Sequence, residues 1–449
     1  MLALSNARAW SVERAGALKP NNHRGRTAHL AVLGGLFALA LATAPAIAAD
    51  LKGSFSGNAY ATFGNIKAGA VAATLGRSAF QGCPCNGTNG QTLTTEVDGL
   101  SAGNSGNVLV AGRTKSTSFT QKTATTAQVQ TTSTVSGLNA LGGLVTADTI
   151  NSVATVSATT KTMTAAPDGS QFANLVVAGQ SIPVNVPQNT VIPLPGLGSV
   201  TLYKVTPAGT MKGSGAITVD MITINISAKN GLGLAVGTKI VIGHALAGFS
   251  RKQPDSMFDG AAYAAMSNDK IGGVLQNKIG RSAFLSLGCR GTSGKTKTNS
   301  IAKMAITGVM SMGDGATTAF GGTEGGIPTS RMTSTVSGLN LLGGVITVGA
   351  VQAVAQSSIQ GGVATGSADG SGFTSLTVAG VPVPLNVPAN TTLTLPLLGT
   401  VTINEQTINN DGSVVVNGLH IKITTANLLG LPVGSELIVA HATSSIAPF

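Results

Sequence analysis

Charged and aromatic side chains are scarce in this chain of 449 residues. Charged residues make up 10% and aromatic residues 4%, and the only tryptophan, Trp10, lies in the N-terminal leader. A groove for single-stranded nucleic acid needs a basic stripe with interleaved aromatic rings, so nucleic acid is not an expected partner. Sugar sites rely on exposed Trp or Tyr faces, and Tyr60, Tyr203 and Tyr263 are the only tyrosines. The composition therefore also disfavours a carbohydrate-binding module.

Long apolar runs are rare too, and the clearest one lies near the N-terminus at residues 31–42. Five basic residues and one acidic residue precede it, and small residues at 46–49 follow it. A basic leader, an apolar core and an Ala-x-Ala-like exit are the three parts of a secretory signal. We predict a signal peptide over residues 1–49, cleaved near Ala48 or Ala49. The alternative is an uncleaved anchor helix.

The chain after this leader keeps 22 basic and 15 acidic side chains, a net charge of +7. No second apolar run is long enough to span a membrane, so we expect a secreted or surface-attached protein without a membrane span. A diffuse positive charge favours weak adhesion to anionic components of a cell envelope.

The chain repeats itself at a spacing of about 200 residues, with six ordered matches. Such a period is far too long for a solenoid repeat, so the two copies are predicted to be whole domains, at 51–248 and 256–449. A polar, proline-containing linker at 249–255 separates them. The matched segments are 57–61 and 260–264, 76–80 and 280–284, 85–88 and 289–292, 132–139 and 333–340, 185–187 and 386–388, and 237–245 and 434–442.

Period-two alternation is clear in the second half of each copy. Ile222, Ile224 and Ile226 alternate with polar residues, and so do Leu419, Ile421 and Ile423. This pattern is typical of strands with one face in a core and one in water. Turn signals at 168–169, 369–370, 194–196 and 411–412 favour hairpins. We predict an all-β fold of two antiparallel β-sandwich-like domains; the alternative is a β-solenoid-like stack. Residues 68–76 are a candidate short helix.

A catalytic group used by both copies should occur at matched positions. Among the acids, Asp168 and Asp369 match, and each lies in an Asp-Gly turn, where the side chain caps the turn. No second carboxylate repeats beside them, so a duplicated acid pair for glycoside hydrolysis is not predicted. A hydrolase site in one copy would draw on unmatched acids, and the candidates are Glu96, Asp98 and Asp269.

His244 and His441 form the other matched polar pair, each near the end of its domain's last strand. Alternation places them on the face of Ile240 and Ile242 in copy one and of Leu437 and Val439 in copy two, so we expect structural histidines bonded to backbone. Tyr60 and Tyr263 are matched as well, and we interpret them as core anchors.

Metal, nucleophile and phosphate motifs are missing or incomplete. His420 is predicted on the polar face of its strand, and its counterpart in copy one is Thr223, so no three-ligand metal site is supported. No Gly-x-Ser-x-Gly elbow appears in a strand–turn–helix setting, and the phosphate-loop-like segment 294–296 lacks its first glycine. We therefore predict neither an enzyme nor a cofactor.

The three cysteines leave several pairings open. Cys85 and Cys289 match between copies, and Cys83 is extra. A Cys83–Cys85 bridge would close a strained ring. Cys85 or Cys83 paired with Cys289 would join the two domains. Otherwise each matched cysteine is a small buried residue, or a free one joins another chain. No redox role is indicated, because the two-residue spacer is absent.

An ordered set of motifs resembles the exported bacterial proteins of the choice-of-anchor P family. It comprises the Ala-Tyr start, the Val-Ser-Gly-Leu-Asn segments with Leu-Gly-Gly, Asn-Val-Pro, and residues 398–406, 416–421 and 431–442. Copy one departs from it at 202–206, where Asn-Glu-Gln is missing. The resemblance implies a surface or extracellular β-domain and supplies no catalytic residues. The chain shows no sorting signal or lipobox cysteine.

Three functions remain open at this point. The first is a non-enzymatic surface, matrix or adhesion protein that binds envelope components or itself, and strand edges would favour self-assembly. The second is a binding module for a cell-wall glycan or another surface polymer. The third is a secreted hydrolase with a site in one copy.

Overall fold

The computed structural model describes residues 51–65, 77–102, 107–252, 256–268, 281–306 and 308–448. The predicted signal peptide, the candidate helix at 68–76 and Asp269 lie outside these ranges. The described residues belong to one compact unit, Ala48–Phe449. Within the described ranges, no helix is long and apolar enough to cross a membrane.

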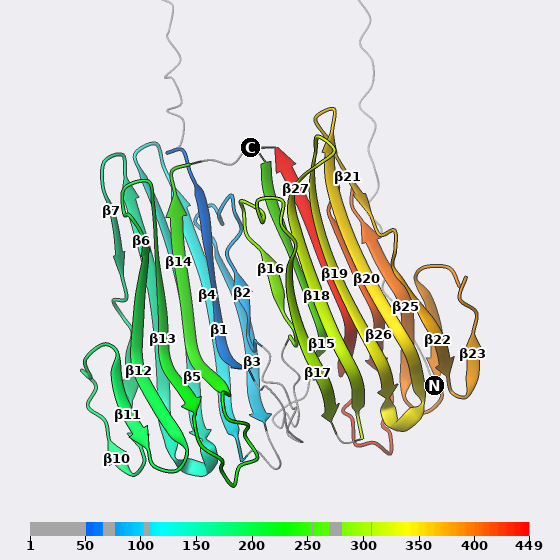
Figure 1. Cartoon of the computed structure of the whole chain (residues 1–449), viewed down its shortest axis with the longest axis horizontal. Coiled ribbons are helices and arrows are strands. Elements are labelled where there is room, and N and C mark those ends of the chain that lie inside the picture. The colour runs from blue at the N-terminus through cyan, green and yellow to red at the C-terminus, as the bar shows by residue number, and fades with distance from the viewer. Residues whose placement is uncertain are drawn as a thin grey trace, which may run out of the picture. The chain divides into compact units, whose positions relative to one another are not determined.

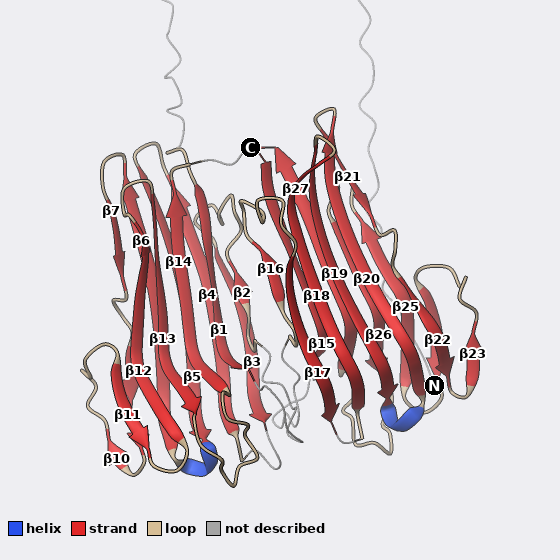
Figure 2. Ribbon diagram, in the orientation of Figure 1, coloured by secondary structure: helices blue, strands red, loops and turns tan. Residues whose placement is uncertain are grey.

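Copy one contains two antiparallel sheets, named A1 and B1 here, and they pack face to face (Figures 1 and 2). Strands β7 (Met163–Ala166) and β8 (Gln171–Ala173) both pair with β6 (Val145–Thr159) of sheet B1. Sheet A1 has the order β11 (Thr190–Leu194), β12 (Gly198–Gly209), β13 (Ser214–Ile226), β14 (Lys239–Ser250), β1 (Ser54–Asn65) and β2 (Gln81–Gly82). Sheet B1 has the order β10 (Gln180–Ser181), β9 (Val176–Val177), β6 (Val145–Thr159), β5 (Thr126–Ala140), β4 (Leu109–Lys122) and β3 (Thr92–Ala102), with β7 (Met163–Ala166) and β8 (Gln171–Ala173).

Copy two repeats this plan in sheets A2 and B2. Sheet A2 has the order β16 (Leu285–Leu287), β15 (Ser256–Asn268), β27 (Glu436–Pro448), β26 (Val414–Ile423), β25 (Gly399–Ile408) and β24 (Thr391–Leu395). Sheet B2 has the order β17 (Lys297–Ile306), β18 (Met310–Glu324), β19 (Ile327–Leu341), β20 (Ile346–Gln360), β22 (Gly372–Val378) and β23 (Val381–Val383), with β21 (Val363–Ser367) on β20. The 3₁₀ turns η2 (Leu141–Gly143) and η3 (Leu342–Gly344) end β5 and β19.

Each copy has its own apolar core between its two sheets. Val129 and Val135 of β5 lie in the copy-one core with Ile222 and Ile242, and Val336 lies in the copy-two core with Ile421. The strands that form these cores alternate buried and less buried residues, as a sandwich requires. The prediction of two all-β, antiparallel sandwich-like domains is therefore confirmed, and the solenoid alternative is wrong.

Buried hydroxyl groups link the two sheets of each core. Ser133 Oγ in β5 donates to the Tyr60 carbonyl oxygen at 3.0 Å, and Ser334 Oγ donates to the Tyr263 carbonyl oxygen at 2.9 Å. Both serines lie in the identical segments 132–139 and 333–340. An unpaired buried carbonyl is costly, so the need for these two serines explains part of the sequence identity of the two segments. The sequence alone did not reveal this reason.

Neighbouring strands of sheet A1 are kinked at paired positions, and sheet A2 has kinks at the matching positions. In A1, Tyr60 pairs with His244 and Thr62 pairs with Ile242, so one residue of each strand is skipped. The skipped residue of β14 is Gly243, which has φ 68°, and copy two has Ala440 with φ 53° at the matching position. Two successive residues then face the core, and the alternation of faces reverses along each strand.

Two sequence predictions about turns and boundaries need correction. The Asp-Gly turns at 168–169 and 369–370 are not hairpins, because the strands on either side of each turn both pair with one neighbour, β6 or β20. The predicted linker starts two residues early, because β14 continues to Ser250.

Candidate functional site

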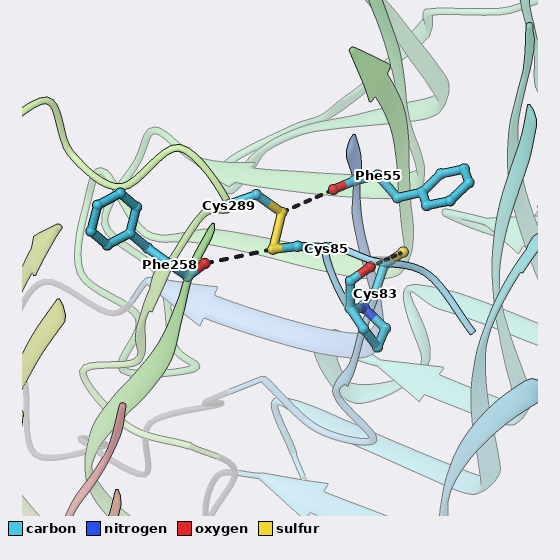
Figure 3. Close-up of a disulfide and its surroundings, with 6 residues drawn as sticks. Phe55, Cys83, Cys85, Phe258 and Cys289 are labelled. Atoms are coloured by element: carbon cyan, nitrogen blue, oxygen red, sulfur yellow. Dashed lines mark hydrogen bonds between the residues drawn. A yellow bond between two sulfur atoms is a disulfide. The ribbon is translucent and has the colours of Figure 1, made fainter. Parts of the chain in front are cut away.

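A disulfide between Cys85 and Cys289 joins the two copies (Figure 3). The Cα atoms lie 5.5 Å apart, and 204 residues separate the two cysteines along the chain. This is one of the pairings that the sequence left open. It covalently links matched positions of the two sandwiches, so neither of these thiols is free for metal binding or catalysis.

Matched residues meet around this disulfide. The Phe55 amide donates to the Cys85 carbonyl at 3.1 Å, and the Phe258 amide donates to the Cys289 carbonyl at 3.1 Å. An isolated antiparallel bridge pairs Arg77 with Arg281. The rings of Phe80 and Phe284, also matched, lie with centroids 4.6 Å apart. The contact is therefore of the isologous kind, in which the same surface of each copy is used.

Arg77 and Arg281 lie among aromatic rings rather than acids. The Arg77 guanidinium carbon is 4.8 Å from the Phe284 ring centroid, and that of Arg281 is 5.0 Å from the Phe80 centroid. Burial lowers the pKa of both arginines from the usual range. Cation–π attraction offsets part of the desolvation cost. Each arginine therefore packs against a phenylalanine ring of the other copy.

Each copy also carries a stacked tyrosine–histidine pair. Tyr60 lies parallel to His244 with centroids 4.1 Å apart, and Tyr263 lies parallel to His441 at 4.3 Å. Burial raises the pKa of both tyrosines. The phenols therefore stay protonated at neutral pH and are poor bases.

The sequence placed these residues on the wrong face of their sheets. Ile240 and Ile242 belong to the copy-one core, whereas Tyr60 and His244 lie on the opposite face beyond the kink at Gly243. Tyr60 and Tyr263 are 5% and 2% exposed, so they are buried, but not in the sandwich cores. The histidines bond to side chains rather than to backbone.

The partner of the matched histidine differs between copies. His244 Nδ1 lies 2.5 Å from Asp220 Oδ1, whereas His441 Nδ1 lies 2.5 Å from the amide oxygen of Asn417. Burial lowers the pKa of His244 despite Asp220, and burial together with Arg281 lowers the pKa of His441 to about 3. A neutral amide cannot stabilise an imidazolium as a carboxylate does. The two copies therefore share the stack but not an acid–histidine dyad.

Copy two adds a second histidine to this network. His420 Nδ1 donates to Glu405 Oε2 at 2.8 Å, and Asn417 Nδ2 donates to the same oxygen at 2.6 Å. The His420 hydrogen bond holds the pKa of Glu405 low, at about 2. His420 is on the predicted outer face but is buried, as is its counterpart Thr223. No group of three potential metal-ligating side chains occurs within the described ranges.

The third cysteine lies in a cavity of about 390 Å³ beside the disulfide, lined by both copies. Burial raises the pKa of Cys83 to about 11, so the thiol stays protonated and is a weak nucleophile at neutral pH. Asp259 also lines this cavity, and burial raises its pKa. In Figure 3 the Cys83 sulfur points away from the disulfide.

The remaining candidate acids lie apart from the histidine network of copy two. Asp168 and Asp369 are exposed, in turns that are closed by backbone bonds from Ser170 to Pro167 and from Ser371 to Ala368. Glu96 pairs with Arg113 and Lys115 across β3 and β4, and Asp98 lies near Arg113. These are cross-strand ion pairs at the surface of sheet B1, in which Glu96 and Asp98 share Arg113. Asp269, the third hydrolase candidate, lies outside the described residues.

No family model, no curated protein and no solved structure matches this chain. The resemblance to the choice-of-anchor P family therefore remains a prediction from the motifs.

Proposed function

We propose that this chain is a non-enzymatic protein of the cell surface or extracellular space with a structural or adhesive role. The disulfide between Cys85 and Cys289 is the observation that carries the proposal. Structural disulfides persist in oxidising compartments and are rare in the cytosol. The basic, apolar and small-residue segments of the leader support the same location.

The polar groups that invite a catalytic role fit a structural role better. His244, His441 and His420 each bond a neighbouring side chain on the same sheet, and the acid that partners His244 is an amide in copy two. Two sandwiches linked by a disulfide and by matched aromatic contacts make a stiff unit, which favours bridging or coating over turnover.

A surface-polymer binding module is the second candidate, and matched threonine rows favour it. On the outer faces of B1 and B2, three cross-strand threonines continue into a valine at the same place in each copy. The rows are Thr94–Thr117–Thr132–Val153 and Thr298–Thr318–Thr333–Val354. Regularly spaced hydroxyls suit a hydroxylated polymer such as a glycan.

Binding of the labelled mature chain, residues 50–449, to isolated cell envelopes tests the proposal. We expect saturable retention on intact envelopes and no turnover of envelope material. Retention that survives lipid extraction and is competed by purified wall glycan would favour the second candidate. Steady release of small products from the envelopes would overturn the non-enzymatic proposal.

A further inference from the structure

Two neighbouring loops at one end of copy two present large apolar side chains to solvent. One is the turn at residues 396–398 between β24 and β25, and the other is the loop at 424–435 between β26 and β27. The amides of Thr424 and Thr425 donate to the Leu398 carbonyl at 3.0 and 3.4 Å, which holds the loops together. The exposed set, called the leucine tip here, is Leu397, Leu428, Leu429 and Val433.

The exposure of the leucine tip is large. Leu397 is 81% exposed, Val433 is 53% exposed, and Leu428 is fully exposed. Single exposed apolar residues are ordinary, but several that lie together mark an interaction site.

Copy one builds the same two loops without two of these leucines, and it keeps Leu232 at the position of Leu429 and Val236 at that of Val433. Gly196 occupies the position of Leu397, and Gly231 occupies that of Leu428. The scaffold is unchanged: Asn230 Oδ1 accepts from the amides of Leu232 and Leu234, as Asn427 Oδ1 accepts from those of Leu429 and Leu431. The loop conformation therefore does not require the leucines.

Leu397 also has a strained backbone. Its φ is 59°, in the left-handed region that Gly196 adopts easily with φ 73°. A β-carbon there is unfavourable, and a side chain that is 81% exposed gains little from burial to offset it. Backbone strain that no burial of the side chain offsets points to a role of Leu397 in an interaction.

The chemistry of the two loops indicates what they meet. Residues 391–403 and 424–435 contain no charged side chain. Asn427 bonds the loop backbone internally, since its amide donates to the Leu431 carbonyl at 2.6 Å while its oxygen accepts two amides. Backbone groups bonded in this way can leave water at low cost.

We propose that the leucine tip inserts into the surface layer of a lipid membrane and attaches the protein there non-covalently. This inference rests on the proposed surface location and names its means of attachment. Because the tip is uncharged, binding does not require anionic lipid and is insensitive to salt.

Flotation of the mature chain with phosphatidylcholine vesicles, at low and high salt, tests the proposal. We expect the wild-type chain to bind equally at both salt concentrations. The double variant Leu397→Gly with Leu428→Gly restores the copy-one residues, and we expect at least a tenfold loss of partitioning. Leu385→Gly is the matched control, since Leu385 is 68% exposed and lies outside the tip, and its binding should be unchanged.

Thermal unfolding of the same variants separates binding from folding. The double variant should keep or raise the midpoint, because a strained residue becomes glycine; a lower midpoint would mean that the leucines serve the fold and would overturn the proposal. Equal binding by wild type and double variant would overturn it too, as would binding only to anionic vesicles. A tip-dependent dimer in light scattering, without vesicle binding, would assign the tip to a second copy. Each of these outcomes leaves the envelope assay as an independent test of the surface role.

Discussion

His441 shows how burial and bonding set the behaviour of one side chain. The unfolded imidazole takes up a proton below about pH 6.5, whereas the pKa of the folded residue is about 3, chiefly because of burial. Between these values the unfolded state binds more protons, so stability falls as the pH falls. Glu405, with a folded pKa of about 2, begins to act only below its unfolded value of 4.5. The interval from pH 6.5 to 4.5 therefore carries the contributions of His244 and His441, and the raised pKa of Asp259 acts there in the opposite direction.

We predict that His441→Gln weakens this acid loss of stability. Going from pH 6.5 to 5 should cost the wild-type chain up to about 2 kcal/mol for His441, and the variant should lose less by about that amount. Urea unfolding at pH 8, 6.5 and 5 measures the difference. Between pH 8 and 6.5 the unfolding free energies of the two proteins should change in parallel. If the unfolding free energy of the variant falls as steeply as that of the wild type down to pH 5, His441 is protonated in the folded state.

The sequence identified the matched residues but not their surroundings. Their pairing as Tyr60 with His244 and Tyr263 with His441 follows from strand register, which a pattern of apolar residues does not fix. The Asp220 partner was missed because no acid repeats there: copy two has Asn417. A search for matched groups cannot find a residue that differs between copies.

Strands and their alternation were predictable, and the kinks in them were not. Gly243 gave a possible signal, since glycine within a strand often marks a bulge, but Ala440 takes the same left-handed conformation without a glycine. The kink reverses the faces beyond it, and for this reason the histidines were placed in the core. Thr223 was expected in water and is buried, although it lies on the sheet face opposite Ile222 and Ile224.

We predict that the two kink positions respond differently to substitution. Gly243→Ala should cost about 1–3 kcal/mol, because a β-carbon there would lie 3.0 Å from Ile150 Cγ2 and the backbone is left-handed. Ala440→Gly should change stability by less than about 1 kcal/mol, since relief of strain offsets loss of a buried methyl. Urea unfolding of both variants at neutral pH compares them. If Gly243→Ala left the unfolding free energy unchanged, the backbone at the kink would be able to shift and accommodate the β-carbon.

Across the whole molecule, the duplication was predictable because six segments recur in order, and the presence of two sandwiches follows from it. The contact between the copies was only partly predictable. Cys85 and Cys289 were recognisable as matched, but Cys83 was an equal candidate until its burial and position were known. The Arg77–Arg281 bridge depends on how folded domains meet, which no local pattern encodes.

Mapping the cysteines of the protein isolated from its natural location, without reductant, tests both the export of the chain and the covalent joining of its two copies. We expect a peptide pair joined through Cys85 and Cys289 and a free thiol at Cys83, in a chain that begins near Asp50. Alkylation of the native protein at neutral pH should label Cys83 slowly, because the thiol is half-buried and its raised pKa keeps it protonated. Three free thiols in a chain that retains its leader would contradict both the export and the covalent joining of the two copies.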